Sequence, residues 1–267
     1  MANLTRTYLL LAVTTTAVGC HQPAPAAPNG VGVSPTVVAM RIDGLDTEAT
    51  VTGTVSALRA VVTLSSGLEL EASDGVVWTS SNDRVARIDA HGVLTALGEG
   101  GVVVSEAVKG MLGTRSIDVV ASVAGTWTLS WTATVCDGGY HVGCCGGQPL
   151  PEVGQVIITQ SGSRVDGTWT ALGWIQGYPP FAGRIATGGS LDLEGFRCSL
   201  DDVGRGTRYF LHGWHMDRAA DGTYAGRLTW EQASGCEGEP QYRILQDLSV
   251  TGFRRAAQGA AATGSIL

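Results

Sequence analysis

The feature that most constrains the fold is a long alternating stretch that begins at Gly125 and leads into a cysteine-rich loop ending near Cys145. Within it, one side carries Trp127, Leu129, Trp131, Ala133 and Val135, while threonine and serine occupy the other. Period-two alternation in aromatic and β-branched residues predicts a half-buried β-strand. A strand nearly twice the typical length favours a barrel or a strongly coiled sheet over a small flat one.

Seven further strands are predicted after this one, with no helical period between them. They span Gln155–Gln160, Arg164–Ala171, Phe181–Ala186, Ser190–Phe196, Thr207–Asp217, Thr223–Glu231 and Ile244–Phe253. Eight consecutive strands predict an antiparallel meander over residues 125–254 that closes into a β-barrel. The positions expected to face inward are Trp127, Leu129, Trp131, Val165, Trp169, Ile185, Leu191, Leu193, Tyr224, Leu228 and Trp230.

Loop length predicts a difference between the two ends of this barrel. The connections expected at one end are short turns at residues 161–163, 187–189 and 218–222. Those at the other end are longer: Cys136–Gly154, Gly173–Pro180, Arg197–Gly206 and Gln232–Arg243. Variable loops on a rigid barrel are a common place for binding. We therefore expect a small ligand, a glycan or a protein to bind there, through Trp174, Tyr178, Tyr140 and His141.

The cysteines gather in the same long loops. Apart from Cys20, they are Cys136, Cys144, Cys145, Cys198 and Cys236. An exported chain favours disulfides, and we expect Cys198 to pair with Cys236 and Cys136 with Cys144 or Cys145. A bridge between the adjacent Cys144 and Cys145, and an intermolecular bond of the leftover thiol, stay open. Zinc at Cys136, His141, Cys144 and Cys145 is the weaker alternative, because adjacent cysteines do not easily share one tetrahedral ion.

The N-terminus indicates export. Residues 1–19 have a short polar start, an apolar run and small residues, as in a signal peptide. The sequence Ala17-Val18-Gly19-Cys20 resembles the lipobox of bacterial lipoproteins, which implies lipidation of Cys20, attachment to a membrane and, since His21 is not aspartate, an outer-membrane location. Residues 20–36 are expected to form a Pro/Ala/Gly-rich tether and residues 255–267 a disordered tail.

Residues 37–122 are predicted to form a β-sandwich of short strands separated by Gly, Asn and Asp. The expected strands are Val37–Ile42, Ala49–Val55, Leu58–Leu64, Val76–Thr79, Val85–Ile88, Val93–Ala96, Gly101–Val108 and Thr114–Ala121. The pattern Trp78-Thr79-Ser80-Ser81-Asn82, Val85 to Asp89, Gly92 to Ala96 and Gly98 to Gly101 resembles the bacterial Ig-like domain of group 2 (BIG2). This resemblance implies a spacer or adhesive module of surface proteins.

The start of the second domain has a resemblance of its own. The sequence Gly125-Thr126-Trp127 is similar to the glycine-x-tryptophan strand that opens the calycin barrels, the lipocalins and avidins. The resemblance implies a cavity that opens at one end and holds a small ligand. The alternative is a barrel filled by its own tryptophans.

Charge and motifs narrow the function further. The net charge of −7, with a pI near 5.2, gives no basic stripe for nucleic acid. We find no serine-nucleophile elbow, zinc-protease helix, phosphate loop or dinucleotide fingerprint, and expect no metal, cofactor or catalytic residue. His212 and His215 are expected on opposite faces of a strand unless a bulge at Gly213 intervenes.

These features favour a noncatalytic cell-surface lipoprotein, in which an Ig-like spacer presents a β-barrel that binds a ligand or partner through its disulfide-linked loops. An adhesive or envelope-scaffolding protein without a ligand pocket is the alternative. A hydrolase that uses histidines or carboxylates at the loops is less favoured.

Overall fold

The computed structural model describes residues 35–45, 47–137, 152–171 and 178–254. All the regular structure in these ranges is β, in eighteen strands, which confirms the predicted all-β class. Within the same ranges, no helix is long and apolar enough to cross a membrane. The signal segment, Cys20, the tether and the tail lie outside the described residues.

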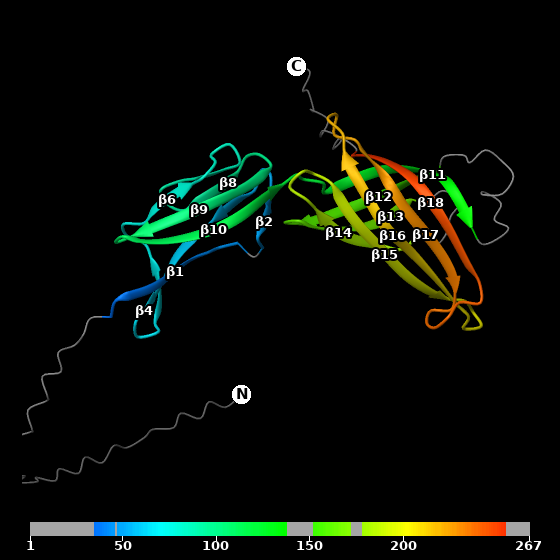
Figure 1. Ribbon diagram of the computed structural model, residues 1–267, viewed down its shortest axis with the longest axis horizontal. Coiled ribbons are helices and arrows are strands. Elements are labelled where there is room, and N and C mark those ends of the chain that lie inside the picture. Colours follow the sequence, from blue (N-terminus) through cyan, green and yellow to red (C-terminus); the bar gives the residue numbers. More distant parts are fainter. Residues whose placement is uncertain (1–34, 46, 138–151, 172–177, 255–267) are drawn as a thin grey trace, which may run out of the picture. The chain divides into compact units, whose positions relative to one another are not determined.

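The first ten strands form three small sheets in a sandwich-like arrangement, coloured blue to green in Figure 1. The sheet orders are β1-β4-β5, β2-β10-β9-β6 and β3-β8-β7. The strands are β1 Val37–Asp43, β2 Ala49–Val51, β3 Val55–Ala57, β4 Arg59–Leu64, β5 Glu69–Ala72, β6 Val77–Ser80, β7 Ala86–Ile88, β8 Val93–Ala96, β9 Gly100–Val108 and β10 Met111–Val120.

The predicted strand Ala49–Val55 is wrong, because the chain turns within it and joins two different sheets. β2 pairs in parallel with β10, whereas β3 pairs antiparallel with β8. The turn between them contains Gly53 at φ +90°, a conformation that glycine adopts without strain. Strand β5 was not predicted, because its residues are mostly exposed and carry no apolar period.

Side-chain hydrogen bonds hold the turn that follows Trp78. Trp78 packs, partly buried, against the sandwich core, and the Ser80 hydroxyl donates to the Ala86 carbonyl at 2.6 Å. The Asn82 side chain accepts from the Arg84 amide at 3.1 Å. Gly92 has φ +80°, and a Cβ there would meet the Leu58 carbonyl at 2.8 Å, so both the turn and the close approach require glycine.

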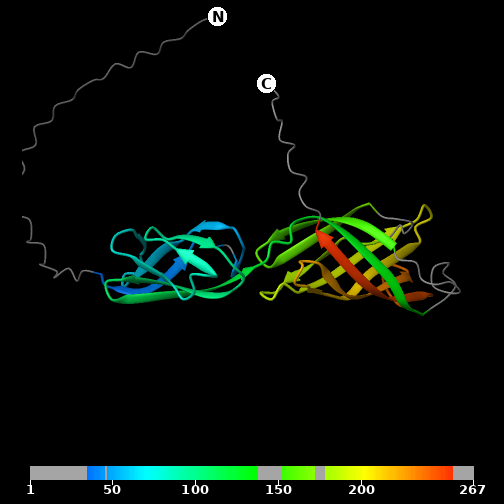
Figure 2. The same ribbon diagram turned by 90° about the horizontal axis from the view of Figure 1, so that it is seen from above.

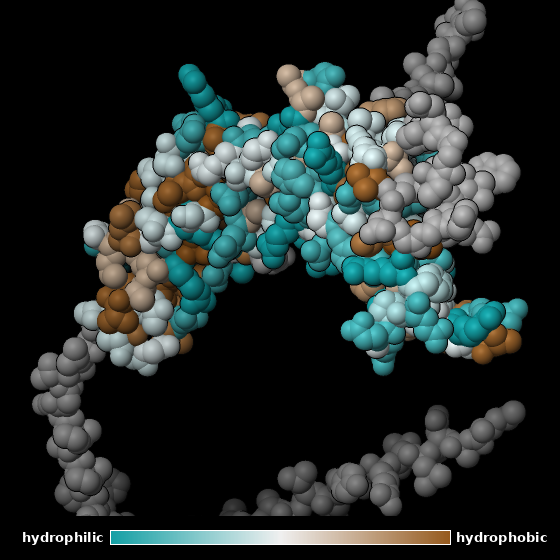
Figure 3. Space-filling view, turned by 45° about the vertical axis from the view of Figure 1, so that its right-hand side comes forward, coloured by the Kyte–Doolittle hydropathy of each residue, from teal (hydrophilic) through white to brown (hydrophobic). Residues whose placement is uncertain are grey.

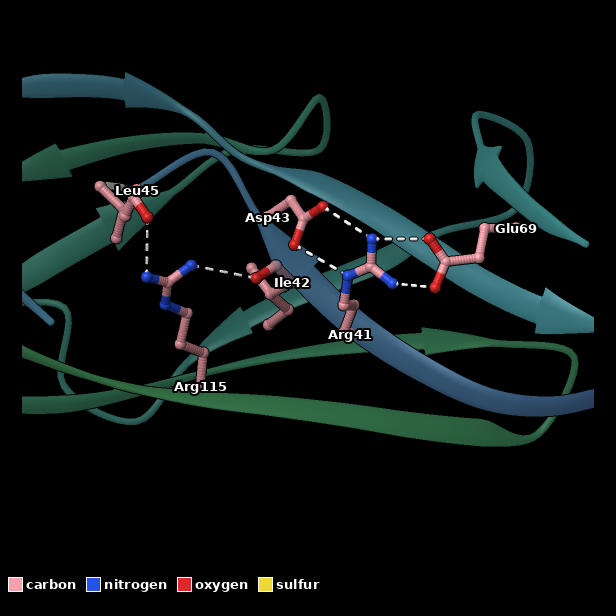
Figure 4. Close-up of polar contacts among 6 residues, drawn as sticks. All are labelled: Arg41, Ile42, Asp43, Leu45, Glu69 and Arg115. Atoms are coloured by element: carbon pink, nitrogen blue, oxygen red, sulfur yellow. Dashed lines mark hydrogen bonds and ion pairs between the residues drawn. The ribbon is translucent and has the colours of Figure 1, made fainter. Parts of the chain in front are cut away.

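Two arginines fix strand β1 at its polar end (Figure 4). Arg115, from β10, donates to the backbone carbonyls of Ile42 at 3.1 Å and Leu45 at 2.9 Å. On the exposed side, Arg41 forms ion pairs with Asp43 and Glu69. The guanidinium of Arg115 therefore supplies donors to carbonyls just where β1 ends and its ladder bonds stop.

The last eight strands close into one antiparallel barrel, as predicted, in the order β11 to β18 (Figure 2). β11 pairs with β18 from Trp127↔Arg254 to Asp137↔Leu245, so the sheet has no free edge. The strands are β11 Gly125–Asp137, β12 Glu152–Ser161, β13 Arg164–Ala171, β14 Phe181–Ile185, β15 Leu191–Leu200, β16 Gly206–Arg218, β17 Tyr224–Ser234 and β18 Arg243–Arg254.

The barrel interior is a single apolar cluster. All the positions expected to face inward belong to it: Trp169 is partly buried and packs against it, and the others are buried. Several further members were not among the predicted inward positions: Val156, Ile158, Tyr178, Phe181, Leu211, Trp214, Met216 and Val250.

The segment that leads into β11 is tied to the barrel. The Gln160 side chain accepts from the Val123 amide at 2.8 Å and donates to the Ala121 carbonyl at 2.9 Å. The Trp127 indole donates to the Val123 carbonyl at 2.7 Å, and Ala121 and Val123 join the barrel core. The short connection before β11 therefore has a fixed conformation against the barrel.

Candidate functional site

The two ends of the barrel differ in their connections. We call the end where β11, β13, β15 and β17 finish the loop end, and the end where β12, β14, β16 and β18 finish the linker end. Short turns at residues 162–163, 186–190 and 219–223 connect the strands of the linker end, as predicted. At the loop end, residues 235–242 form a longer connection.

One loop-end connection is shorter than predicted. Only residues 201–205 separate β15 from β16, because these strands continue pairing to Leu200↔Gly206. The Asp201 carboxylate closes this turn by accepting from the Val203 amide at 3.1 Å and the Arg205 amide at 2.8 Å. These backbone hydrogen bonds, together with the Arg205 guanidinium, lower the pKa of Asp201. Asp201 is thus a turn residue and not part of a binding loop.

The predicted disulfide between Cys198 and Cys236 is present, with the two Cα atoms 5.5 Å apart. Cys198 lies within β15 and not in a loop, whereas Cys236 lies in the connection between β17 and β18. The bridge therefore fixes the longer loop to the wall of the barrel. Cys144 and Cys145 lie outside the described residues, and Cys136 is the residue before Asp137, where β11 ends, so the second predicted disulfide is not described.

Of the four predicted ligand-binding residues, the structure describes Tyr178. It is only 4% exposed and packs inside the barrel, so its expected place on an open loop is wrong. Pro179 follows it and accepts a hydrogen bond from the Trp169 indole at 2.9 Å, which holds this segment against the inner wall. Trp174, Tyr140 and His141 lie outside the described residues.

The loop-end half of the interior is lined by aromatic rings. The Trp131 and Trp169 rings meet at 75° with centroids 5.6 Å apart, and the Trp131 and Tyr178 rings meet at 64° and 5.1 Å. The centroid of the Trp230 ring lies 6.3 Å from the ring centroids of both Tyr178 and Tyr209. Such edge-to-face contacts are favourable for aromatic rings, and they create an aromatic layer across the barrel.

This aromatic layer contains buried polar atoms that lack partners. Among the described residues, the indole nitrogens of Trp131 and Trp230 and one carboxylate oxygen of Glu152 have no hydrogen-bond partner. Glu152 faces inward, because it pairs directly with Trp131 and shares the parity of the buried Val156. Buried polar groups are normally satisfied by protein or water. The Trp131 indole still interacts with the Glu152 carboxylate, and this interaction lowers the pKa of Glu152 against the effect of burial.

The charge of Glu152 affects the ionisation of Tyr178. Burial raises the pKa of Glu152. Burial, followed by the negative charge of Glu152, raises the pKa of Tyr178. Sequence reasoning missed Glu152 because the predicted strand began later, at Gln155. The alternation Glu152, Gly154, Val156 could have revealed it.

Further polar side chains follow toward the rim on the inner face. The register pairs Arg197 with Tyr209, Tyr209 with Gln232, and Gln246 with Trp230, so these residues share the inward side. Toward the linker end, the inner face carries the aliphatic Ile158, Val165, Ile185, Leu191 and Val250 together with the edge-to-face pair of Trp127 and Tyr224. The charged and amide side chains of the inner face therefore lie toward the loop end.

The predicted alternative of a bulge at Gly213 is correct. Gly213 has φ +53°, and the pairing of β16 with β17 shifts between His212↔Thr229 and His215↔Arg227. Both histidines consequently lie on the outer face, while Trp214 between them is buried. They have separate partners: His215 bonds to Asp192 at 2.6 Å and Asp217 at 3.3 Å, and the bond to Asp192 is the main cause of its raised pKa.

His212 belongs to a small groove of about 450 Å³ on the outer face. Its Nε2 lies 3.1 Å from the Glu231 carboxylate, which also accepts from Arg243 at 2.7 Å and is 6% exposed. Burial alone would raise the pKa of Glu231, but the bonds and charges of Arg243 and His212 outweigh it and lower the pKa. Within the described ranges, no group of three or more His, Cys, Asp or Glu side chains is placed to hold a metal ion.

Comparison with known proteins gives no family. No family model matches the chain, and no curated protein matches it. Solved structures give distant likenesses. A structural-genomics protein of unknown function from Bacteroides ovatus is 9% identical, with 81% of this chain and 94% of that chain covered, at a TM-score of 0.26. The surface-layer protein SbsC, domains 1–6, is 12% identical, with 78% of this chain and 42% of that chain covered, at a TM-score of 0.28. The S-layer protein rSbsC(31-844) is 12% identical, with 81% of this chain and 38% of that chain covered, also at a TM-score of 0.28. At these scores the likenesses support no statement about function.

Proposed function

We propose that the protein is a noncatalytic envelope protein whose β-barrel binds a small ligand inside its loop-end half, with the sandwich as a spacer. The observation that supports this role most directly is the group of unpartnered polar atoms of Trp131, Trp230 and Glu152 within an aromatic layer. The Cys198–Cys236 disulfide ties the connection at residues 235–242 to the barrel wall at this end. A rigid, apolar site with a few convergent polar groups is the usual form of a small-ligand site.

Two conservative variants test the binding site. Trp131→Phe and Trp230→Phe each remove an indole N–H and keep an aromatic ring, whereas Phe253→Ser changes a side chain that is 52% exposed on the outer face. We expect native mass spectrometry of the exported protein to show a small-molecule adduct that dissociates on denaturation. The adduct should weaken in both tryptophan variants and persist in Phe253→Ser. Equal adducts in all three variants would place the ligand elsewhere.

The proposed location is the outer membrane, with a lipid on Cys20. The support is the sequence alone: small residues before a cysteine that follows an apolar export segment. Metabolic labelling with an alkyne fatty acid tests it. Label should enter the wild type and not Cys20→Ser, and label in both would exclude Cys20 as the acceptor.

Adhesion is a second candidate, supported by an apolar row on the sandwich. Val77 and Leu112 are 60% and 68% exposed and pair with Ala107 from either side, so three apolar residues cross β6, β9 and β10. Apolar residues are also exposed on this part of the surface in Figure 3. If adhesion is the function, Leu112→Glu should abolish attachment of the protein to immobilised cell envelopes, and Leu200→Glu, on the barrel, should not.

The hydrolase alternative has one supporting contact, that of His212 with Glu231 in the outer groove. Glu231 is already held by Arg243, which stabilises its charge and makes it a weaker base. We therefore expect no turnover of chromogenic ester or glycoside substrates. Activity that disappears in His212→Gln would overturn the noncatalytic proposal.

A further inference from the structure

The inner face of the loop-end half combines one carboxylate with several aromatic rings. Glu152 faces Trp131 across the β11–β12 pair, and Tyr178 packs against the same tryptophan. The rings of Trp131, Trp169 and Tyr178 meet at angles of 41° to 75° and are not stacked in one column. Rings set at such angles around a carboxylate are the usual surroundings of a bound ammonium group.

The unpartnered atoms add a requirement for hydrogen bonding. One oxygen of Glu152 and the indole N–H of Trp230 have no partner at hydrogen-bond distance, and the Trp131 indole, which interacts with the Glu152 carboxylate, has no closer acceptor. A ligand that satisfies both kinds of atom carries a donor cation and at least one acceptor oxygen. A simple hydrocarbon would leave these polar atoms buried without a closer partner, which is costly.

We propose that the barrel binds a small organic amine, with Glu152 as the counter-ion of the ammonium group, the rings of Trp131 and Tyr178 around that group, and an oxygen of the ligand accepting from an indole N–H. This inference rests on the proposed function of the loop end and adds the ligand's charge. Arg197 and Gln232, at the rim, remain for additional polar groups of the ligand.

Three phenols of similar size and different charge test this inference: tyramine, 4-ethylphenol and 3-(4-hydroxyphenyl)propionate. Isothermal titration of the full chain should show that tyramine binds at least about tenfold tighter than either of the others. Glu152→Gln should remove this preference, so that tyramine binds no tighter than 4-ethylphenol. Glu194→Gln, which removes an exposed charge from the same barrel on its outer face, should change nothing.

Protonation gives a second readout. Because burial raises the pKa of Glu152, an ammonium group that pairs with it should drive its ionisation and release a proton. Titrations at several pH values above the ordinary carboxyl pKa, in buffers of different ionisation enthalpy, should detect this proton in the wild type and not in Glu152→Gln.

The results separate the two levels of the proposal. Equal binding of all three phenols would overturn the amine and leave the binding site standing. The same conclusion would follow if no phenol bound while the native protein carried a neutral or anionic adduct. Absence of both phenol binding and any adduct would overturn the site itself.

Discussion

Glu106 gives the sharpest test of the sandwich. It lies on the same face of β9 as the buried Val102, Val104 and Val108, it is fully buried, and neither carboxylate oxygen has a partner among the described residues. Space for the carboxyl group exists only because residue 113 is glycine, since a Cβ there would lie 2.6 Å from Glu106 Oε1. Replacement by glutamine keeps the size of the side chain and removes its charge.

The magnitude follows from the pKa of Glu106. Burial, with a smaller contribution from Asp43, raises this pKa from 4.5 to about 7. Between these values the folded state holds a proton that the unfolded state has released, so the free energy of unfolding falls as pH rises. At about 1.4 kcal/mol per pKa unit, the free energy of unfolding has fallen by about 3 kcal/mol once the pH is above 7. Glu106→Gln should avoid this loss.

The assay compares variants at each pH, so that the other titrating groups cancel. Urea unfolding, followed by hydrogen exchange and mass spectrometry of peptides from β9 and β10, reports the stability of the sandwich. We expect Glu106→Gln to match the wild type within about 1 kcal/mol at pH 5, since both side chains are then neutral. At pH 8 it should be more stable by about 2 to 3 kcal/mol.

Glu71→Gln is the control, because Glu71 is exposed on β5. A pH-dependent difference shared by both variants would not come from burial of Glu106. If the difference between Glu106→Gln and the wild type is constant from pH 5 to pH 8, the Glu106 carboxyl group does not titrate in this range and the burial argument is refuted.

Three further predictions concern the barrel. Replacing Cys198 and Cys236 by serine removes a bridge between residues 38 apart in sequence, so the free energy of unfolding in urea should fall by about 4 kcal/mol. An unchanged urea midpoint would show that the bridge contributes nothing to stability. Asp192→Asn should lower the raised pKa of His215 toward about 6.5, as measured by NMR titration. The stability that this contact contributes is present below about pH 6.5 and is lost as pH rises through the raised pKa; an unshifted titration would contradict the contact. In Gly183→Ala, the new Cβ would lie 1.9 Å from the Asp192 carbonyl, so a loss of about 2 kcal/mol or more is expected in thermal unfolding, and a stable variant would show that the strands can separate.

Much of the barrel was predictable because its determinants are local. Alternation in β11, β13 and β17 fixed which side chains face inward, and glycine-rich turns marked the linker end. The Cys198–Cys236 pair was predictable because the meander brings the two connections to one end. These properties require only strand parity and the order of the strands.

The remainder depends on pairing between strands. The bulge at Gly213 changes, in the middle of β16, which residues face inward. The sequence predicted this bulge only as one of two alternatives for the faces of His212 and His215. Cys198 and Asp201 were expected in a long loop because pairing to Leu200↔Gly206 cannot be read from residues with little apolar pattern. Glu152, which now carries the binding proposal, lay just before a predicted strand start.

The pairing of the first and last barrel strands also determines the response of this domain to mechanical force. β11 begins, and β18 ends, at the same point of their antiparallel pair, near Trp127↔Arg254. A load applied between residues 125 and 254 would therefore open the pair like a zipper, one ladder bond after another, instead of shearing all of them together. The barrel would yield at low tension, and the loop end would be the last part of this seam to open.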